Sequence, residues 1–310
     1  MDIALVTWSG LPDLFPDDRP LAQALAAAGL DVGVVCWDDP GFDWSSTRIA
    51  LLRSPWDYYR RAEEFLSWAE RTAAVTSLVN PWPLVRWNLH KGYLAELAAR
   101  GAPVVPTALV RRSPEYRAGT YARLLAERGW GDAVVKPAVS ADSWETVRVA
   151  AGEPQRGEAH LARLLPERDM LVQPYLPSVE AAGERCLVFL DGQFSHAVRK
   201  NALTLGGRWT DLPEGVPVAA AADELAAAER ILAAAWDSAG VAGPGGTLYA
   251  RVDLARDAAG RPLLLELELA EPTLFLADAP AAVSRLAAAL GRLAAERRTA
   301  GSPPGPPDSG

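Results

Sequence analysis

The sequence has few cysteines, few histidines and no long hydrophobic run, and each of these absences excludes a class of protein. Its two cysteines, Cys36 and Cys186, lie in apolar, strand-like runs, so we expect core residues in a reducing compartment and no disulfide framework. The three histidines are too dispersed for a local zinc motif. No stretch approaches the roughly 18 uncharged apolar residues of a membrane helix, so we expect a cytoplasmic protein with no membrane partner.

The chain also has little positive charge, and nearly all of it is arginine. A formal net charge of −8 and the lack of a long basic cluster argue against a nucleic-acid partner. The run from Met1 to Thr7 lacks the basic segment of a signal peptide. Of 31 basic residues, only Lys91, Lys136 and Lys200 are lysines. Lysine is a compact point charge suited to phosphate, so these three positions are candidate phosphate contacts, with chance survival on the surface as the alternative.

The N-terminal pattern predicts a parallel βαβ unit. Residues 3–8 form an apolar strand, 21–29 an alanine-rich helix that ends at glycine, and 31–37 a second strand. No glycine-rich turn follows the first strand, which argues against a dinucleotide-binding dehydrogenase. A third strand, 49–53, leads into the aromatic and charged loop 53–59. That loop is either a substrate wall at the carboxyl end of the sheet or a cluster that caps the core.

Two glutamates near the C-terminus indicate a cation site. In the run 263–272, strand alternation places Glu266 and Glu268 on one face and the leucines on the other. The segment 256–261 is turn-like, and if its loop is even-numbered Arg251 and Asp253 join the same face. Three carboxylates in one patch are costly without a cation, and an all-oxygen ligand set favours Mg²⁺ or Mn²⁺. A solvated hairpin face with alternating charge is the alternative.

The order of these pieces resembles the ATP-grasp superfamily, in its glutathione-synthetase-like branch. Within it, the motifs are similar to those of the cyclo-ligases that form the D-cycloserine ring from O-ureido-D-serine. The resemblance covers roughly residues 2–297, and it rests on the order and spacing of five motifs more than on any one of them. These motifs are Arg53-Ser54-Pro55-Trp56-Asp57-Tyr58, Arg86-Trp87-Asn88, Val134 to Ser140, His196-Ala197-Val198-Arg199-Lys200 and Glu266-Leu267-Glu268.

The resemblance implies a mixed α/β and α+β fold, in which an N-terminal parallel-sheet domain precedes two α+β lobes that enclose ATP. We expect the N-terminal domain at 1–88, the central lobe at 89–175 and the C-terminal lobe at 176–300. The Pro/Gly/Ser-rich tail, 301–310, is expected to be disordered.

The resemblance also implies roles for particular residues. Two departures from the family pattern stand out: Glu268 replaces a usual asparagine, and Asp142 replaces a glycine expected in the phosphate loop. One or two Mg²⁺ ions, or Mn²⁺, complete the implied site. The implied residues are Lys91 and Lys136 for the ATP phosphates; Gln173, Tyr175 and Leu176 for adenine; Glu180 for ribose; Asp253, Glu266 and Glu268 for the metal; and Arg199, Lys200 and Arg251 for the γ-phosphate or intermediate.

The implied activity is that of an ATP- and Mg²⁺-dependent ligase that activates a carboxylate-like or ureido group of a small amino-acid-like substrate. Phosphoryl transfer needs positioning and charge neutralisation, which separated lysines, an arginine and carboxylates supply without a side-chain nucleophile. Intramolecular ring closure is the leading prediction. The alternatives are an intermolecular amide or peptide ligase, a small-molecule kinase and a non-catalytic nucleotide-binding protein. The chain is expected to be a monomer or a homodimer.

Overall fold

The computed structural model describes residues 1–141, 143–200 and 215–300, so the predicted disorder of 301–310 and the position of Asp142 lie outside the described residues. The N-terminal part is a parallel sheet in the order β2-β1-β3-β4, which confirms the βαβ prediction. Both β1 and β3 are continuous apolar runs that are wholly buried, as expected for strands covered on both faces. The elements are β1 (Ile3–Thr7), α1 (Arg19–Ala27), β2 (Val32–Cys36), β3 (Ile49–Leu52), α2 (Ala62–Val75) and β4 (Ser77–Val79).

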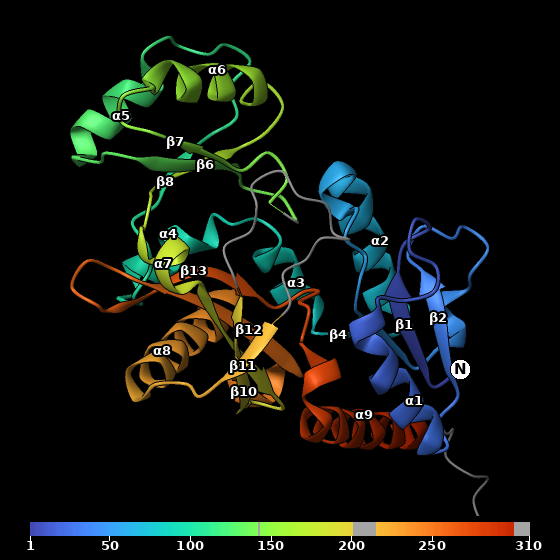
Figure 1. The fold of residues 1–310 in the computed structure, drawn as a ribbon. Helices are drawn as coiled ribbons and strands as arrows, with labels where there is room; N and C mark the ends of the chain where they lie inside the picture. The colour runs from blue at the N-terminus through green and yellow to red at the C-terminus, as the bar shows by residue number, and fades with distance from the viewer. Residues whose placement is uncertain (142, 201–214, 301–310) are drawn as a thin grey trace, which may run out of the picture.

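Two short helices, α3 (Trp82–Asn88) and α4 (Tyr93–Ala99), lead from this sheet to a small antiparallel sheet in the order β5-β8-β6-β7. Helices α5 (Thr120–Arg128) and α6 (Pro154–Leu164) pack on one face of that sheet and form the upper lobe in Figure 1. The other face has no helix over it in this view, and it looks toward the rest of the molecule. The strands are β5 (Ala108–Val110), β6 (Ala133–Pro137), β7 (Val147–Val149) and β8 (Met170–Pro174).

The third sheet is antiparallel, in the order β11-β10-β9-β12-β13. Helix α8 (Ala222–Ala239) packs on one face. The C-terminal helix α9 (Pro280–Ala300) lies across the other face and also packs on α1, so the N-terminal and C-terminal parts share a core (Figure 1). The strands are β9 (Glu184–Leu190), β10 (Gln193–Lys200), β11 (Gly215–Val218), β12 (Tyr249–Arg256) and β13 (Pro262–Glu268), with the short helix α7 (Ser178–Ala182) before them.

These sheets give the mixed α/β architecture that the sequence predicted. The domain boundaries near residues 88 and 175 stay predictions. In the described part of the chain, no helix has both the length and the apolar character needed to cross a membrane.

A β-bulge sets the register of the β12–β13 hairpin. Near the turn, Arg256 pairs with Pro262, which leaves a loop of five residues, 257–261. An odd-numbered loop by itself would put Asp253 and Glu266 on opposite faces. Leu254 pairs with Leu264 but Asp253 pairs with Glu266, so Leu265 is an extra residue on β13. The bulge restores the predicted arrangement by a route that the sequence did not predict.

Side chains from α3 and α4 complete the outer edge of β13. The Asn88 amide donates to the Leu267 carbonyl and accepts from the Leu269 amide, both at 2.8 Å. The Tyr93 hydroxyl lies 3.0 Å from both the nitrogen and the oxygen of Leu267. Because an unpaired strand edge is costly when buried, these contacts fix the strand that carries Glu266 and Glu268.

Candidate functional site

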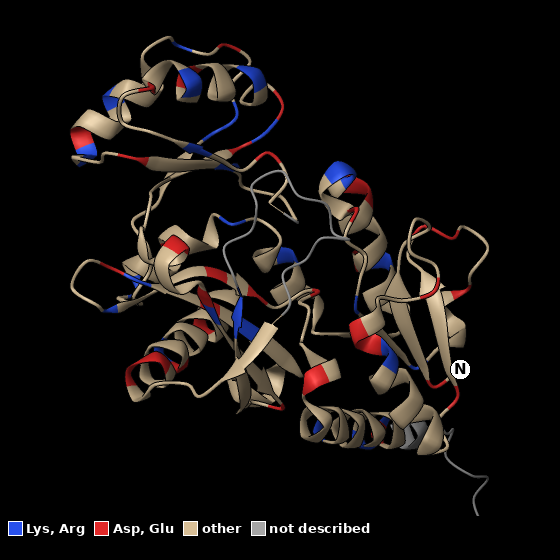
Figure 2. Cartoon of the chain, in the orientation of Figure 1, with Lys and Arg blue, Asp and Glu red and all other residues tan. Residues whose placement is uncertain are grey.

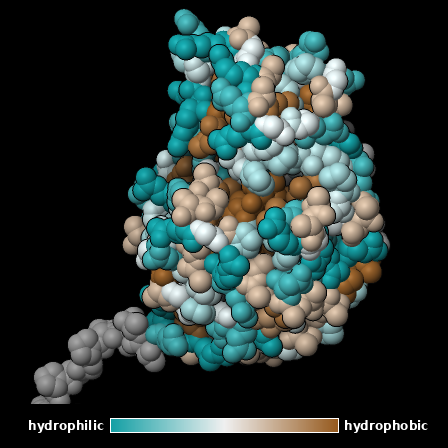
Figure 3. Space-filling model, turned by 90° about the vertical axis from the view of Figure 1, so that its left-hand side faces the viewer, coloured by the Kyte–Doolittle hydropathy of each residue, from teal (hydrophilic) through white to brown (hydrophobic). Residues whose placement is uncertain are grey.

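A cavity of about 270 Å³ lies between the upper lobe and the third sheet. Figure 3 shows hydrophobic residues at the floor of a hollow beneath that lobe, and Figure 2 shows acidic and basic residues side by side in the middle of the third sheet. The cavity joins an apolar end to a charged end. Its apolar end is lined by Val105, Val134, Leu176, Val179 and Leu265.

All four residues predicted for the nucleoside line this cavity: Gln173, Tyr175, Leu176 and Glu180. The Gln173 side chain is only 3% exposed and donates to the Thr107 hydroxyl at 2.9 Å, so it braces β8. Sequence reasoning missed Arg148, which stacks 3.7 Å from the Tyr175 ring centroid and pairs with Glu180 at 2.6 Å. No local motif singled out this arginine, because its role depends on the pairing of β6 with β7 and β8.

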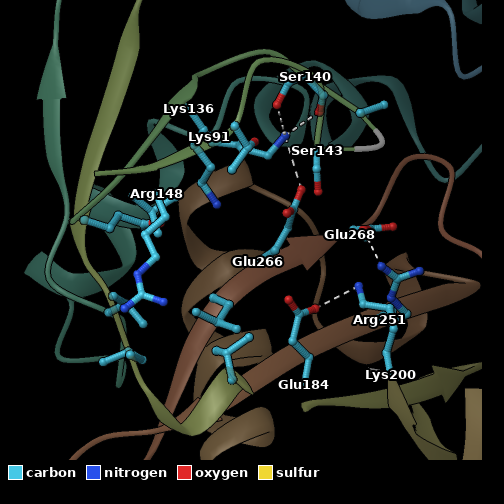
Figure 4. Close-up of a pocket in the computed structure, with 18 of the residues that line it drawn as sticks. Lys91, Lys136, Ser140, Ser143, Arg148, Glu184, Lys200, Arg251, Glu266 and Glu268 are labelled. Carbon is cyan, nitrogen blue, oxygen red and sulfur yellow. Dashed lines mark hydrogen bonds and ion pairs between the residues drawn. The ribbon is translucent and has the colours of Figure 1, made fainter. Parts of the chain in front are cut away.

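The predicted phosphate lysines Lys91 and Lys136 point into the charged end together, toward Glu266 (Figure 4). The Lys91 ammonium donates to the Ser140 carbonyl at 2.6 Å and lies 3.2 Å from Glu266 Oε1. The side chain of Lys136, at the end of β6, forms no hydrogen bond or ion pair with any described residue. Burial lowers the pKa of Lys136, which means that its charge lacks compensation there. An anionic ligand would supply that compensation.

The hairpin carboxylates lie at the same end, but they do not all face the cavity. Glu266 and Glu268 line it, whereas the Asp253 side chain is 2% exposed and is not among the described lining residues. The Arg251 guanidinium holds both Asp253 oxygens at 2.8 Å and also contacts Glu268. Despite burial, Arg251 and Lys200 lower the pKa of Asp253 to about 2.

Lys200 and Arg251 reach the cavity, but Arg199 does not. Alternation along β10 sends the Arg199 side chain to the opposite face, where it pairs in register with Arg185. The Lys200 ammonium lies 2.8 Å from Glu184 and 3.4 Å from Asp253. Glu184 itself lines the cavity. From the sequence alone, Glu184 and Arg185 could equally have formed an exposed ion pair.

A divalent cation fits beside Glu266 and Glu268. Burial raises the pKa of Glu268 to about 8 although Arg251 opposes the shift, because Asp253 and Glu266 add further negative charge. The negative charge of these carboxylates therefore exceeds the positive charge of the neighbouring side chains, and an all-oxygen set of donors suits Mg²⁺. A second group of possible ligands, Glu184, Cys186 and Asp253, has its ligand atoms within 4.8 Å of one another. The Lys200 ammonium already lies against both of its carboxylates, so we do not assign a metal there.

The loop after β3 has two roles, which the sequence left as alternatives. Arg53 is fully buried, pairs with Asp18 at 2.8 Å and therefore belongs to the core. Trp56 and Tyr58 line the cavity beside Glu271, which the sequence did not single out. Glu271 comes three residues after Glu268, beyond the end of β13, so strand alternation gave no information about its direction.

We expect Glu271 to make the stability of the free protein depend on pH. Burial raises the pKa of Glu271 from 4.5 to about 7. Between these values the folded chain holds a proton that the unfolded chain has released, so stability falls as pH rises. Relative to Glu271→Gln, the wild-type Tm should fall from pH 5 to pH 7 and then level off in a thermal-unfolding series. Parallel curves for the two proteins would contradict this.

Comparison with known proteins identifies the fold and the family. The family model for the N-terminal domain of D-cycloserine synthetase DcsG matches residues 3–80. The cycloserine biosynthesis protein DcsG of Streptomyces lavendulae is 38% identical over 293 residues, which are 93% of this chain and 97% of that protein. The crystal structure of D-cycloserine synthetase DcsG superposes with a TM-score of 0.86 at 36% identity, covering 94% of this chain and 100% of that one.

More distant structures share the fold alone. An ATP-grasp RimK domain protein from Sphaerobacter thermophilus has a TM-score of 0.66 at 18% identity, with 94% of this chain and 99% of that chain covered. D-alanine–D-alanine ligase from Bacillus anthracis has a TM-score of 0.59 at 11% identity, with 97% and 100% covered. The full-length match at 38% identity carries the assignment further than these: the chain belongs to the D-cycloserine synthetase family of ATP-grasp ligases.

Proposed function

We propose that this protein is an ATP- and Mg²⁺-dependent cyclo-ligase that converts the open-chain O-ureido-D-serine into the ring compound D-cycloserine. One observation carries the proposal: an apolar recess opens directly onto Lys136, which has no ion-pair partner among the described residues, and onto a set of charges suited to phosphoryl transfer. The similarity to D-cycloserine synthetase along nearly the whole chain supports the substrate. The proposal includes the two cofactors, ATP and Mg²⁺.

In the proposed complex, the adenine lies in the apolar end against Leu176 and Leu265, near Tyr175. Glu180, which forms an ion pair with Arg148 and lines the cavity, would contact the ribose, as the resemblance implies. Lys91 and Lys136 then contact the phosphates, because a compact ammonium at the end of the apolar recess suits a phosphate oxygen. Ser140 orients Lys91 through its carbonyl.

Glu266 and Glu268 would hold Mg²⁺, which neutralises phosphate charge and fixes the orientation of the transferred group when bound. Asp253 faces Arg251 and Lys200, so its predicted role as a ligand rests on the resemblance alone. Lys200 and Arg251 border the cavity, and in the proposed complex they would neutralise negative charge on the substrate carboxylate and the leaving phosphate.

The proposed chemistry needs no side-chain nucleophile. The substrate carboxylate attacks the γ-phosphate of ATP, giving an acyl phosphate and ADP. The ureido nitrogen bonded to oxygen then attacks the acyl carbon: a C–N bond forms, the C–O bond to phosphate breaks, and the released phosphate takes the nitrogen's proton. The carbamoyl group left on the ring nitrogen is removed by one water as carbon dioxide and ammonia.

Turnover with a single substrate tests the proposal. Purified protein with ATP, Mg²⁺ and O-ureido-D-serine should release ADP, and mass spectrometry should detect D-cycloserine. ADP release that requires an added amino acid or peptide would instead indicate an intermolecular ligase. A stable phosphorylated product would indicate a kinase, and no ADP with any amino-acid or ureido substrate would overturn catalysis altogether.

A further inference from the structure

One carboxylate in the cavity, Glu271, has no ion-pair partner among the residues that the structure describes. Glu271 lines the cavity together with Trp56 and Tyr58. Among the residues that the structure describes, no lysine, arginine or histidine forms an ion pair with Glu271, and the Tyr58 side chain is its hydrogen-bond partner. A partly buried carboxylate without a counter-charge is stabilised when a cation arrives.

The backbone around Glu271 is held in place by side chains from distant parts of the chain. Each of the six consecutive carbonyl groups from Leu269 to Leu274 lies within hydrogen-bonding distance, 2.7–3.1 Å, of a side-chain donor. A segment fixed in this way presents its carboxylate in one position, which favours recognition of a single group on a ligand. In chain order of the carbonyls, the donors are Asn80, Tyr249, Trp56, Arg53, Arg251 and His196.

The neighbours of Glu271 suit an organic ammonium group better than a metal ion. Trp56 and Tyr58 are 7% and 4% exposed, and both border the cavity. Aromatic rings attract organic cations, whereas Mg²⁺ requires a near-octahedral set of oxygens that these rings do not provide. The carboxylates that offer such oxygens, Glu266 and Glu268, lie further along the same wall, on β13.

The cationic Arg251 side chain lies next to this position. Arg251 donates to the Thr273 carbonyl at 3.0 Å, so its guanidinium reaches the same segment two residues beyond Glu271. Lys200 lines the cavity as well. An α-amino acid carries its ammonium and carboxylate groups on one carbon, and adjacent anionic and cationic subsites match that zwitterion.

Resting on the proposed function, we infer that Glu271, with Tyr58 and Trp56 beside it, binds the α-ammonium group of the amino-acid substrate. It is a substrate-binding residue beside the cations that would meet the substrate carboxylate. Loss of one charged hydrogen-bonding partner should weaken binding by about 10- to 100-fold. Glu271→Gln should therefore raise the KM for O-ureido-D-serine by that factor and leave the KM for ATP unchanged.

The ammonium group is tested by removing it from the ligand as well as its partner from the protein. Wild type and Glu271→Gln are each assayed with O-ureido-D-serine and with its des-amino analogue, 3-(ureidooxy)propanoic acid. The Gln substitution should raise the KM for O-ureido-D-serine and leave the KM for the des-amino analogue unchanged. Glu271→Asp keeps the charge, so it should retain part of the preference for O-ureido-D-serine. Glu167→Gln, on the surface, is the matched control. An equal rise in the KM for both compounds in Glu271→Gln would overturn the inference.

A binding measurement separates this inference from the proposed function. Calorimetry compares D-serine with 3-hydroxypropanoate, on both proteins, with a non-hydrolysable ATP analogue and Mg²⁺ present. If the ureido substrates give no ADP but wild type prefers D-serine and Glu271→Gln does not, ring closure is wrong and the ammonium subsite stands. If wild type binds the two compounds equally, or binds neither, the subsite is wrong whatever the turnover assay shows.

Discussion

Replacing Lys136 with methionine should lower the rate of ADP formation by a factor on the order of 10² to 10³ without unfolding the protein. The Lys136 ammonium lies at the end of β6 in the cavity and has no ion-pair partner among the described residues. Its lowered pKa means that the free protein tolerates the charge at a cost, and a bound phosphate removes that cost. Methionine keeps the length of the side chain and removes the charge.

Two measurements separate loss of function from loss of structure. Lys136→Met should have a Tm equal to or slightly above that of wild type, and ATP with Mg²⁺ should no longer raise it. Lys136→Arg should recover little activity, because a broad guanidinium does not replace a compact ammonium. Arg123→Met, on the exposed side of α5 in the same lobe, is the control for charge removal. Wild-type turnover in Lys136→Met would refute the phosphate role of this lysine.

Replacing Arg251 with methionine should lower the free energy of unfolding by about 3–5 kcal/mol. The guanidinium is the main counter-charge of Asp253, whose side chain is 2% exposed, and it also contacts Glu268. Without it, the Lys200 ammonium, at 3.4 Å, is the cation that remains paired with Asp253 among the described residues. The corresponding loss in Tm is on the order of 10 °C. ADP formation should fall as well, since Arg251 borders the cavity.

A double-mutant cycle tests the cause of that instability. Asp253→Asn removes the buried negative charge that has lost its arginine partner, so Arg251→Met/Asp253→Asn should be more stable in urea than Arg251→Met alone. The two substitutions together should cost clearly less than the sum of their separate effects. Additive losses would mean that the pair does not stabilise the fold through its charges. Activity should remain low in the double variant, because Asp253→Asn does not restore the cation that Arg251→Met removes from the cavity.

Local sequence patterns predicted a substantial part of the molecule. Continuous apolar runs predicted the buried parallel strands, because strands covered on both faces have no solvent-exposed positions. The scarcity of lysine singled out three positions, and all three line the cavity. Alternation alone placed Glu266 and Glu268 on one face of β13, where both line the cavity.

Tertiary structure decided which of these residues meet. The predicted placement of Asp253 on the same face as Glu266 required either an even-numbered loop or a compensating bulge, and the protein has the bulge at Leu265. Alternation on β10 turned the Arg199 side chain away from the cavity, and the Arg251 guanidinium neutralised Asp253. In the sequence, Arg199 and Asp253 had fitted the family motifs as well as the residues that do line the cavity.

Glu271 shows most clearly the difference between what the sequence determines and what the tertiary structure decides. The sequence by itself determined the strand before it and the residue type. Its place in the cavity depends on side chains from the N-terminal part of the chain and from the third sheet that hold the carbonyls around it. Alternation and apolar periodicity are local properties, which a sequence states directly. The neutralisation of one charge by another depends on contacts between residues far apart in the chain, and only the folded structure brings these together.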